Sequence, residues 1–243
     1  MKLKVIDVSH HQGKIDWTKV KADGVQGAII RVSDSVETMD RECDRNIAGC
    51  ERAGIPFGLY IYSRANNEER TRQEAEIVLN KARGHKLGFP IYIDLEQAGT
   101  ESYAVRGAKL FGKLVQAEGY WCGVYANQNW FQTVIGNSLN EFTKWVARYG
   151  SQKPEIPNTD MWQYSSTGRV AGITENVDLN IAYRDFPKLI KGTGNGKVYY
   201  TIQKGDTLSG IAKKFGTTVS ILKARNGIRD VNKIYAGERI RVK

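Results

Sequence analysis

The chain has 243 residues, enough for one large domain or for a medium domain joined to a small one. Hydrophobic residues make up 41% and charged residues 26%, values that exclude a largely disordered chain. No apolar run approaches the roughly 18–20 residues of a membrane-spanning helix, so we expect no membrane insertion. An acid, Asp7, stands where a signal peptide would carry its apolar stretch. We therefore expect synthesis in the cytoplasm without a signal peptide.

The formal net charge of +10 is concentrated in the last part of the chain. From Lys197 onward there are 11 Lys and Arg residues and 3 Asp and Glu residues, which leaves a net charge of only +2 for the first 196 residues. These cations are scattered among apolar residues without the aromatic platforms of single-strand binders, so we expect no nucleic-acid partner. An anionic surface such as a bacterial wall fits the same charge.

Cysteine and histidine are too few and too dispersed for a metal site. The three cysteines, Cys43, Cys50 and Cys122, cannot all pair within one chain and include no Cys-x-x-Cys motif, so reduced, buried thiols are expected. The three histidines form no zinc signature. We expect neither a metal nor another cofactor.

Short apolar stretches alternate with helical patterns over about the first 126 residues. Strands are predicted over residues 3–9, 27–32, 57–62, 90–96 and 121–126, and helices over 16–21, 40–53, 67–83 and 102–118. Gly54 is expected to end the second helix. Three further strands, over 142–149, 161–165 and 177–183, follow without long helices. The pattern indicates an α/β barrel of about five βα units closed by three helix-poor strands.

Chemically useful side chains are predicted at the carboxyl ends of these strands, where barrels place their reactive groups. They are Asp7, Arg31, Tyr60, Tyr62, Asp94, Glu96, Tyr125, Gln163, Tyr164 and Asp178. Asp94 and Glu96 alternate along one strand, so both should point the same way and raise one another's pKa. Such a pair suits sugar hydrolysis, because one acid protonates the leaving oxygen while the other stabilises the cationic transition state. The tyrosines suit stacking on sugar rings.

Each of these residues also has a purely structural interpretation. The tyrosines could equally well be core or rim residues without a role in binding. Arg31 can serve as the ion-pair partner of a neighbouring acid. Asp178 can cap a turn.

Four motifs in order carry a family resemblance. The opening stretch Asp7-Val8-Ser9-His10-His11-Gln12-Gly13 continues into Lys14-Ile15-Asp16-Trp17 and is followed by Asp94-Leu95-Glu96, Met161-Trp162-Gln163-Tyr164-Ser165 and Val177-Asp178-Leu179-Asn180. Over roughly residues 3–186 the chain resembles glycoside hydrolase family 25, the N-acetylmuramidases, and the resemblance implies a (β/α)5(β)3 TIM-like barrel. It also implies Glu96 as general acid and Asp94 as its partner, with Asp7 and Asp178 lining the cleft. Tyr60, Tyr62, Tyr125, Gln163, Tyr164 and Arg31 are the expected substrate-binding residues.

Two stretches depart from that family's pattern. Family members often carry a Thr-Glu-Gly-like stretch after the second strand, whereas this chain has Ser33-Asp34-Ser35-Val36-Glu37. The third strand commonly ends in a Tyr-His pattern and here reads Tyr60-Ile61-Tyr62. Substrate contacts of the kind seen in the family are therefore not expected to carry over unchanged after the second strand.

A second domain is predicted beyond a glycine-rich segment. Residues 1–190 form the expected catalytic barrel, 191–197 a flexible linker with three glycines, and 198–243 a small domain. The tail resembles a LysM module through Tyr200 to Ala212 and Asn226-Gly227-Ile228, which implies a βααβ fold that binds N-acetylglucosamine-containing glycans. The expected contacts, mainly through backbone groups, are Gly205, Asp206, Thr207, Leu208, Asn226 and Ile228. Read structurally, Asp206 could be a helix N-cap and Leu208 a core residue.

Together these features predict a peptidoglycan hydrolase that cleaves the β-1,4 bond between N-acetylmuramic acid and N-acetylglucosamine. Bacterial peptidoglycan is the expected partner, and the oligomeric state is left open. A phage endolysin released through a holin-type pore and a bacterial enzyme exported by another route both fit. A chitinase or glucosaminidase, a non-catalytic wall-binding protein and a nucleic-acid binder are the alternatives; the last predicts salt-sensitive DNA binding.

Overall fold

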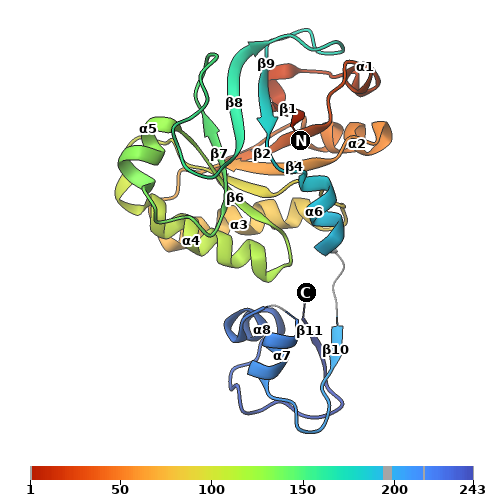
Figure 1. Ribbon diagram of the computed structural model, residues 1–243, viewed down its shortest axis with the longest axis vertical. Coiled ribbons are helices and arrows are strands. Elements are labelled where there is room, and N and C mark those ends of the chain that lie inside the picture. Colours follow the sequence, from red (N-terminus) through yellow and green to blue (C-terminus); the bar gives the residue numbers. More distant parts are fainter. Residues whose placement is uncertain (1, 194–198, 216, 243) are drawn as a thin grey trace.

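The chain forms an α/β barrel followed by a smaller domain (Figure 1). The structure, a computed structural model, describes residues 2–193, 199–215 and 217–242. The strands of the first domain are β1 (Leu3–Val8), β2 (Gly27–Asp34), β3 (Thr38–Met39), β4 (Phe57–Tyr62), β5 (Ile91–Asp94), β6 (Cys122–Asn127), β7 (Thr143–Ala147), β8 (Thr159–Gly168) and β9 (Val177–Ala182). Its α-helices are α1 (Trp17–Ala22), α2 (Cys43–Ala53), α3 (Glu68–Ala82), α4 (Glu101–Ala117), α5 (Gln128–Trp130) and α6 (Phe186–Thr193).

The sheet closes on itself because β1 pairs with both β2 and β9. The strand order is β1-β9-β8-β7-β6-β5-β4-β2-β3, with β3 as a short antiparallel addition at the edge of β2. Pairings from β1 through β2, β4, β5, β6 and β7 to β8 are parallel. In contrast, β9 runs antiparallel to both of its neighbours, β8 and β1. One end of the barrel therefore combines the carboxyl ends of seven strands with the amino end of β9.

Local sequence accounts for where several of these elements begin and end. Gly54 ends α2 in the left-handed conformation, with φ of 64°, as predicted. Asn67 caps α3 by accepting a hydrogen bond from the backbone N–H of Arg70. Ser9 and Gln12 form a reciprocal capping box around the 3-10 turn His10–Gln12, which fixes the loop after β1.

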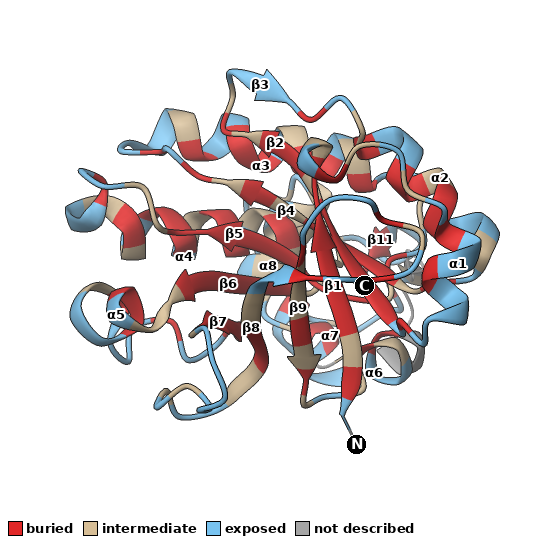
Figure 2. Ribbon diagram, turned by 90° about the horizontal axis from the view of Figure 1, so that it is seen from above, coloured by how far each residue is buried: buried red, intermediate tan, exposed pale blue. Residues whose placement is uncertain are grey.

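The strands of the barrel are largely buried (Figure 2), and their apolar side chains belong to two clusters. One cluster includes Val5, Ile29, Tyr92 and Trp145, and a larger cluster packs the strands against the surrounding helices. Fully burying one such side chain stabilises the fold by about 1.5–3 kcal/mol relative to leaving it exposed. All three cysteines are reduced and buried, as predicted.

Several elements of the structure differ from the predicted ones. The fourth predicted strand extends to Glu96, whereas β5 ends at Asp94. Strand β3, the short helical segment made of α5 and the π-helical turn Phe131–Ile135, and helix α6 were not predicted. The absence of long helices between β7 and β9 was predicted correctly.

The second domain has the predicted βααβ order. It contains β10 (Tyr199–Thr201), α7 (Leu208–Lys214), α8 (Val219–Asn226) and β11 (Arg239–Arg241), and the two strands pair antiparallel. Its core contains Ile202, Leu208, Ile211, Leu222 and Val242. The predicted linker began at residue 191, but α6 continues through Thr193; residues 194–197 lie outside the described part of the chain.

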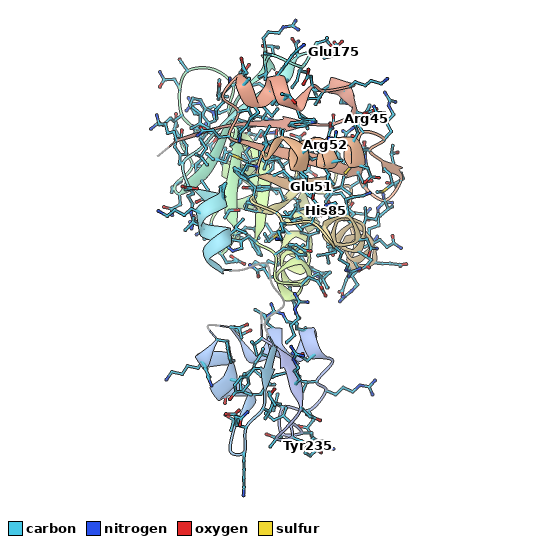
Figure 3. The ribbon with its side chains drawn as sticks, turned by 90° about the vertical axis from the view of Figure 1, so that its right-hand side faces the viewer. Arg45, Glu51, Arg52, His85, Glu175 and Tyr235 are labelled. Carbon is cyan, nitrogen blue, oxygen red and sulfur yellow. The ribbon has the colours of Figure 1, made fainter. Side chains whose placement is uncertain are left out.

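Two arginines join the domains at the carboxyl end of α4. The Arg225 guanidinium donates to the backbone oxygens of Ala117 (2.6 Å) and Gln116 (2.8 Å). Arg241 donates to the Glu118 backbone oxygen and forms an ion pair with its carboxylate at 3.2 Å. These cations lie where a helix exposes unpaired carbonyl groups and partial negative charge, so the contact is electrostatically favourable. Figure 3 shows Tyr235 at the far end of the small domain, away from the barrel.

Among the described residues, no helix combines the length and the apolar character that crossing a membrane requires.

Candidate active site

Four acids gather at the barrel end that combines the strand carboxyl ends with the amino end of β9. Asp7 lies in β1 and is the direct cross-strand partner of Asp178 in β9. The antiparallel direction of β9 corrects the prediction that every site residue follows the carboxyl end of its strand: Asp178 lies near the start of β9. The Nε2 group of Gln12 donates to the Asn176 oxygen at 2.9 Å, so the opening motif also holds the segment that enters β9.

Asp7 is held by a buried hydrogen-bond network. Its Oδ2 accepts from Asn180 Nδ2 at 2.7 Å and from Gln163 Nε2 at 3.0 Å. Asn180 in turn accepts from the Trp145 indole N–H at 2.7 Å, and Gln163 accepts from the Tyr125 hydroxyl at 2.8 Å. These contacts fix the orientation of the carboxyl group. Burial, and next the charge of Asp178, raise the pKa of Asp7 despite the two donors.

Asp94 and Glu96 differ in exposure. Asp94 is 4% exposed at the end of β5, and burial followed by the charge of Glu96 raises its pKa well above the usual range. Glu96 is half-buried, and burial followed by the charge of Asp178 raises its pKa. The acids are therefore coupled, and the pKa directions alone do not decide which one donates a proton. Accessibility favours Glu96.

A cavity of about 280 Å³ opens beside Glu96. Its walls are formed by Glu96, Tyr125, Asn127, Ala147 and Tyr149. Tyr149 is 58% exposed, and its hydroxyl donates to Gln163 Oε1 at 3.2 Å. An exposed ring and a protonatable carboxyl thus border the same space, an arrangement that suits a sugar ring and its glycosidic oxygen.

The other predicted contact residues fall into two groups. Tyr60 packs edge-on against Trp145, and the acids Asp7, Asp94 and Asp178 raise its pKa after burial, so it lies with the acidic cluster. The Tyr62 hydroxyl lies 3.4 Å from Gln97 Oε1, next to Glu96 in the sequence. Both rings therefore belong to the acidic end of the barrel.

Arg31 and Tyr164 are less directly placed for substrate contact. Arg31 donates from Nε to the buried Asp40 at 3.0 Å, which is the ion-pair role considered from the sequence, although its charge also lowers the pKa of Asp94. Tyr164 packs on Trp162 at 5.6 Å between ring centroids. Since side chains alternate along a strand, this pair lies on the opposite face of β8 from Gln163, which binds Asp7.

In the small domain, several predicted glycan contacts have structural roles for their side chains. Leu208 is 2% exposed in the core. Thr207, rather than Asp206, caps α7, while Asp206 accepts from the Gln203 backbone N–H. Asn226 bonds the backbone of Arg241 from both of its amide atoms and so links α8 to β11.

The remaining residues of that set lie on the loops. Gly205 occupies a turn at φ of 92°, and Ile228 packs partly buried against the core. Both loops therefore offer mainly backbone groups to a glycan. Glycan binding by these loops stays a prediction.

Tyr149 and Asn180 were not predicted as site residues. Asn180 stands two positions after Asp178, so strand alternation placed it on the same face. Tyr149 falls within the strand predicted over residues 142–149, whereas β7 ends at Ala147 and Tyr149 lines the same cavity as Glu96.

A larger cavity of about 650 Å³ lies elsewhere, between the barrel and the small domain. Its lining includes Trp121, Arg184 and Phe215, but none of the four clustered acids. The acids, rather than cavity size, therefore locate the candidate active site.

Comparisons with known proteins agree with this geometry. The family described as Glycosyl hydrolases family 25 matches residues 6–173, and the LysM domain family matches residues 200–243. Lysozyme M1 of Streptomyces globisporus is 28% identical over 200 residues, which cover 72% of this chain and 66% of that protein. The autolytic lysozyme of Clostridium acetobutylicum is 29% identical over 181 residues, covering 73% of this chain and 55% of that protein.

A solved structure extends the agreement to the fold. The catalytic domain of endolysin ply40 from bacteriophage P40 of Listeria monocytogenes superposes with a TM-score of 0.66 and 27% identity, over 79% of this chain and 98% of that one. The chain spans about two thirds of the first curated relative and 55% of the second. With more than half of its length matched by one family, the chain belongs to glycosyl hydrolases family 25 and carries a C-terminal LysM domain.

Proposed function

We propose that this protein is a peptidoglycan hydrolase that cleaves the β-1,4 bond between N-acetylmuramic acid and N-acetylglucosamine. The observation that carries the proposal is the position of Glu96, half-buried beside a cavity and next to three other acids in a family 25 barrel. An acid with a raised pKa keeps its proton at higher pH, as a general acid must.

In the proposed reaction Glu96 donates its proton to the glycosidic oxygen as the bond to the anomeric carbon breaks. Asp94, buried at the end of β5 two residues before Glu96, supplies negative charge toward the oxocarbenium-like transition state. Asp94 can fill this role in three ways. It can attack covalently, stabilise the transition state by its charge alone, or orient the substrate's own acetamido group. Asp7, fixed by Asn180 and Gln163, completes the acidic wall.

The LysM domain is proposed to hold wall glycan while the barrel cuts. Its sequence carries most of the net positive charge of the chain, which suits an anionic wall. Attachment raises the local concentration of substrate without entering the chemistry.

The test is digestion of purified peptidoglycan followed by borohydride reduction and mass spectrometry of the fragments. We expect new reduced muramic-acid ends from the intact protein and from Glu141→Gln, an exposed acid lining the cavity at the other end of the barrel. Glu96→Gln should lose about 10²–10⁴-fold in rate, the usual contribution of a general acid. Reduced glucosamine ends would instead show a glucosaminidase, and wall binding without any new ends would show a non-catalytic wall protein.

A further inference from the structure

The segment that follows β2, where this chain departs from the family pattern, is held in an unusual conformation. Ser35 has a positive φ of 54°, a region that non-glycine residues seldom occupy. Its carbonyl oxygen accepts from the Ser33 hydroxyl at 2.6 Å, and its N–H donates to the Tyr62 oxygen at 2.8 Å. This backbone conformation costs free energy, so contacts of the surrounding residues must stabilise Ser35 in it.

A buried carboxylate on α3 provides that support. Glu74 is fully buried and accepts three hydrogen bonds: from the Ser35 hydroxyl at 2.6 Å, the Ser63 hydroxyl at 2.6 Å and the Arg64 backbone N–H at 3.0 Å. Burial raises the pKa of Glu74, and these donors oppose that effect. The proposed hydrolysis makes no use of Glu74. Its placement instead joins the segment after β2 to the segment after β4.

Arg64 extends this connection to the edge of the acidic cluster. Its guanidinium donates from Nε and Nη2 to the two Asp34 oxygens at 2.7 and 3.1 Å, and from Nη1 to Gln97 Oε1 at 3.0 Å. The same Gln97 oxygen lies 3.4 Å from the Tyr62 hydroxyl, and the guanidinium lies 5.2 Å from the Tyr62 ring centre. We call Asp34, Tyr62, Arg64 and Gln97 the Arg64 rim.

The Arg64 rim offers a ligand both a ring face and hydrogen-bond donors. The Arg64 side chain is 44% exposed, and its bonds to Asp34 and Gln97 use three of the five guanidinium N–H groups. The rim adjoins Glu96 through Gln97. The rim therefore lies within reach of a glycan whose scissile bond is at Glu96.

We propose that Glu74 is a positioning residue that sets the Arg64 rim, and that this rim binds the glycan beside the scissile bond. The inference rests on the proposed function. Glu74 acts through Ser63 and Arg64 and touches neither substrate nor the reacting atoms. Because the rim contacts a part of the substrate that does not react, it contributes similar binding in the ground state and the transition state.

The test compares kcat and KM on soluble, uncrosslinked peptidoglycan chains for Glu74→Gln, Arg64→Ala and the double variant. The control is Glu76→Gln, the same change two residues along α3, where the carboxylate is exposed and paired with Arg83 at 3.1 Å. We expect KM to rise about 10-fold in Glu74→Gln, as for the loss of one good hydrogen bond to a charged group, with kcat within about 2-fold. Glu76→Gln should match the intact protein.

The double variant separates positioning from general destabilisation. If Glu74 acts through Arg64, the KM of the double variant should equal that of Arg64→Ala alone. Effects on KM that multiply, or a lower melting temperature in Glu74→Gln with KM unchanged, would overturn the inference. Should Glu74→Gln fail to fold, Ser63→Ala takes its place in the same comparison, since Ser63 supplies one of the three donors. An intact protein that releases no reducing ends would instead refute the proposed function.

Discussion

Asn180 offers a direct measure of what the buried network around Asp7 contributes to stability. The side chain is 1% exposed, donates to Asp7 at 2.7 Å and accepts from the Trp145 indole at 2.7 Å. Asn180→Leu keeps the approximate volume and removes both hydrogen bonds. Trp145 is itself 1% exposed, so its N–H would be left buried without a partner.

The expected loss follows from these two contacts. A buried donor left unsatisfied costs about 1–3 kcal/mol, and the lost bond to Asp7 adds about 0.5–1.5 kcal/mol. The sum of about 1.5–4.5 kcal/mol corresponds to a fall of about 3–18 °C in the melting temperature of a domain of this size.

Urea unfolding followed by tryptophan fluorescence measures this change in the barrel alone. All five tryptophans, Trp17, Trp121, Trp130, Trp145 and Trp162, lie in the first domain. The matched control is Asn46→Leu, because Asn46 is equally buried but has no side-chain hydrogen-bond partner among the described residues. We expect Asn46→Leu not to lower the unfolding free energy, since it removes no such bond and replaces two buried polar atoms that have no partner among the described residues. Equal stability of Asn180→Leu and the intact protein would refute the reasoning.

Three further changes test the electrostatics. In Asp178→Asn the pKa of Glu96 should fall, because a neighbouring negative charge is removed; the high-pH side of the kcat/KM profile should then move to lower pH, and an unchanged profile would contradict the coupling. Asp7→Asn should be more stable than the intact protein in urea unfolding at pH 7. The folded-state pKa of Asp7 is raised, so the stability of the intact protein falls as the pH rises above about 3.9, the pKa of an unfolded Asp. The extra stability of Asp7→Asn should therefore vanish near pH 4. Arg225→Gln should loosen the contact with α4, seen as a larger radius of gyration in X-ray scattering, with barrel unfolding unchanged as the control; an unchanged radius would show that Arg225 does not hold the domains together.

The sequence predicted most of the barrel because its signals are local. Gly54, the apolar strand runs and the helix-poor stretch after residue 140 act through backbone preference and periodicity, and the structure has these features where expected. Helix α6 and the short helical segment of α5 and the π-helical turn were not predicted, because each is too short to show a clear helical period.

The site was predicted less completely because its geometry depends on pairing between distant strands. Asp178 lies opposite Asp7 because β9 pairs antiparallel with β1. The direction of a strand in a sheet cannot be read from that strand's own sequence. Tyr164 shares a motif with Gln163 yet faces away from Asp7, and Asp94 and Glu96 differ in burial because β5 ends between them. Glu74 carries no sequence signal of its own, because its three hydrogen-bond donors come from segments outside α3.

Arg225 and Arg241 attach the small domain to the carboxyl end of α4, which is the end remote from Glu96. Helix α4 starts shortly after Glu96 and runs 17 residues to Ala117, about 25 Å at 1.5 Å per residue. A single glycan strand would have to run at least that far to occupy both domains, whereas two neighbouring strands of a mesh reach them independently. If the small domain retains one strand while the barrel cuts another, as the proposed function implies, loss of the cut product does not release the protein. Under the proposed function we expect successive cuts to spread sideways through the polymer rather than along one strand.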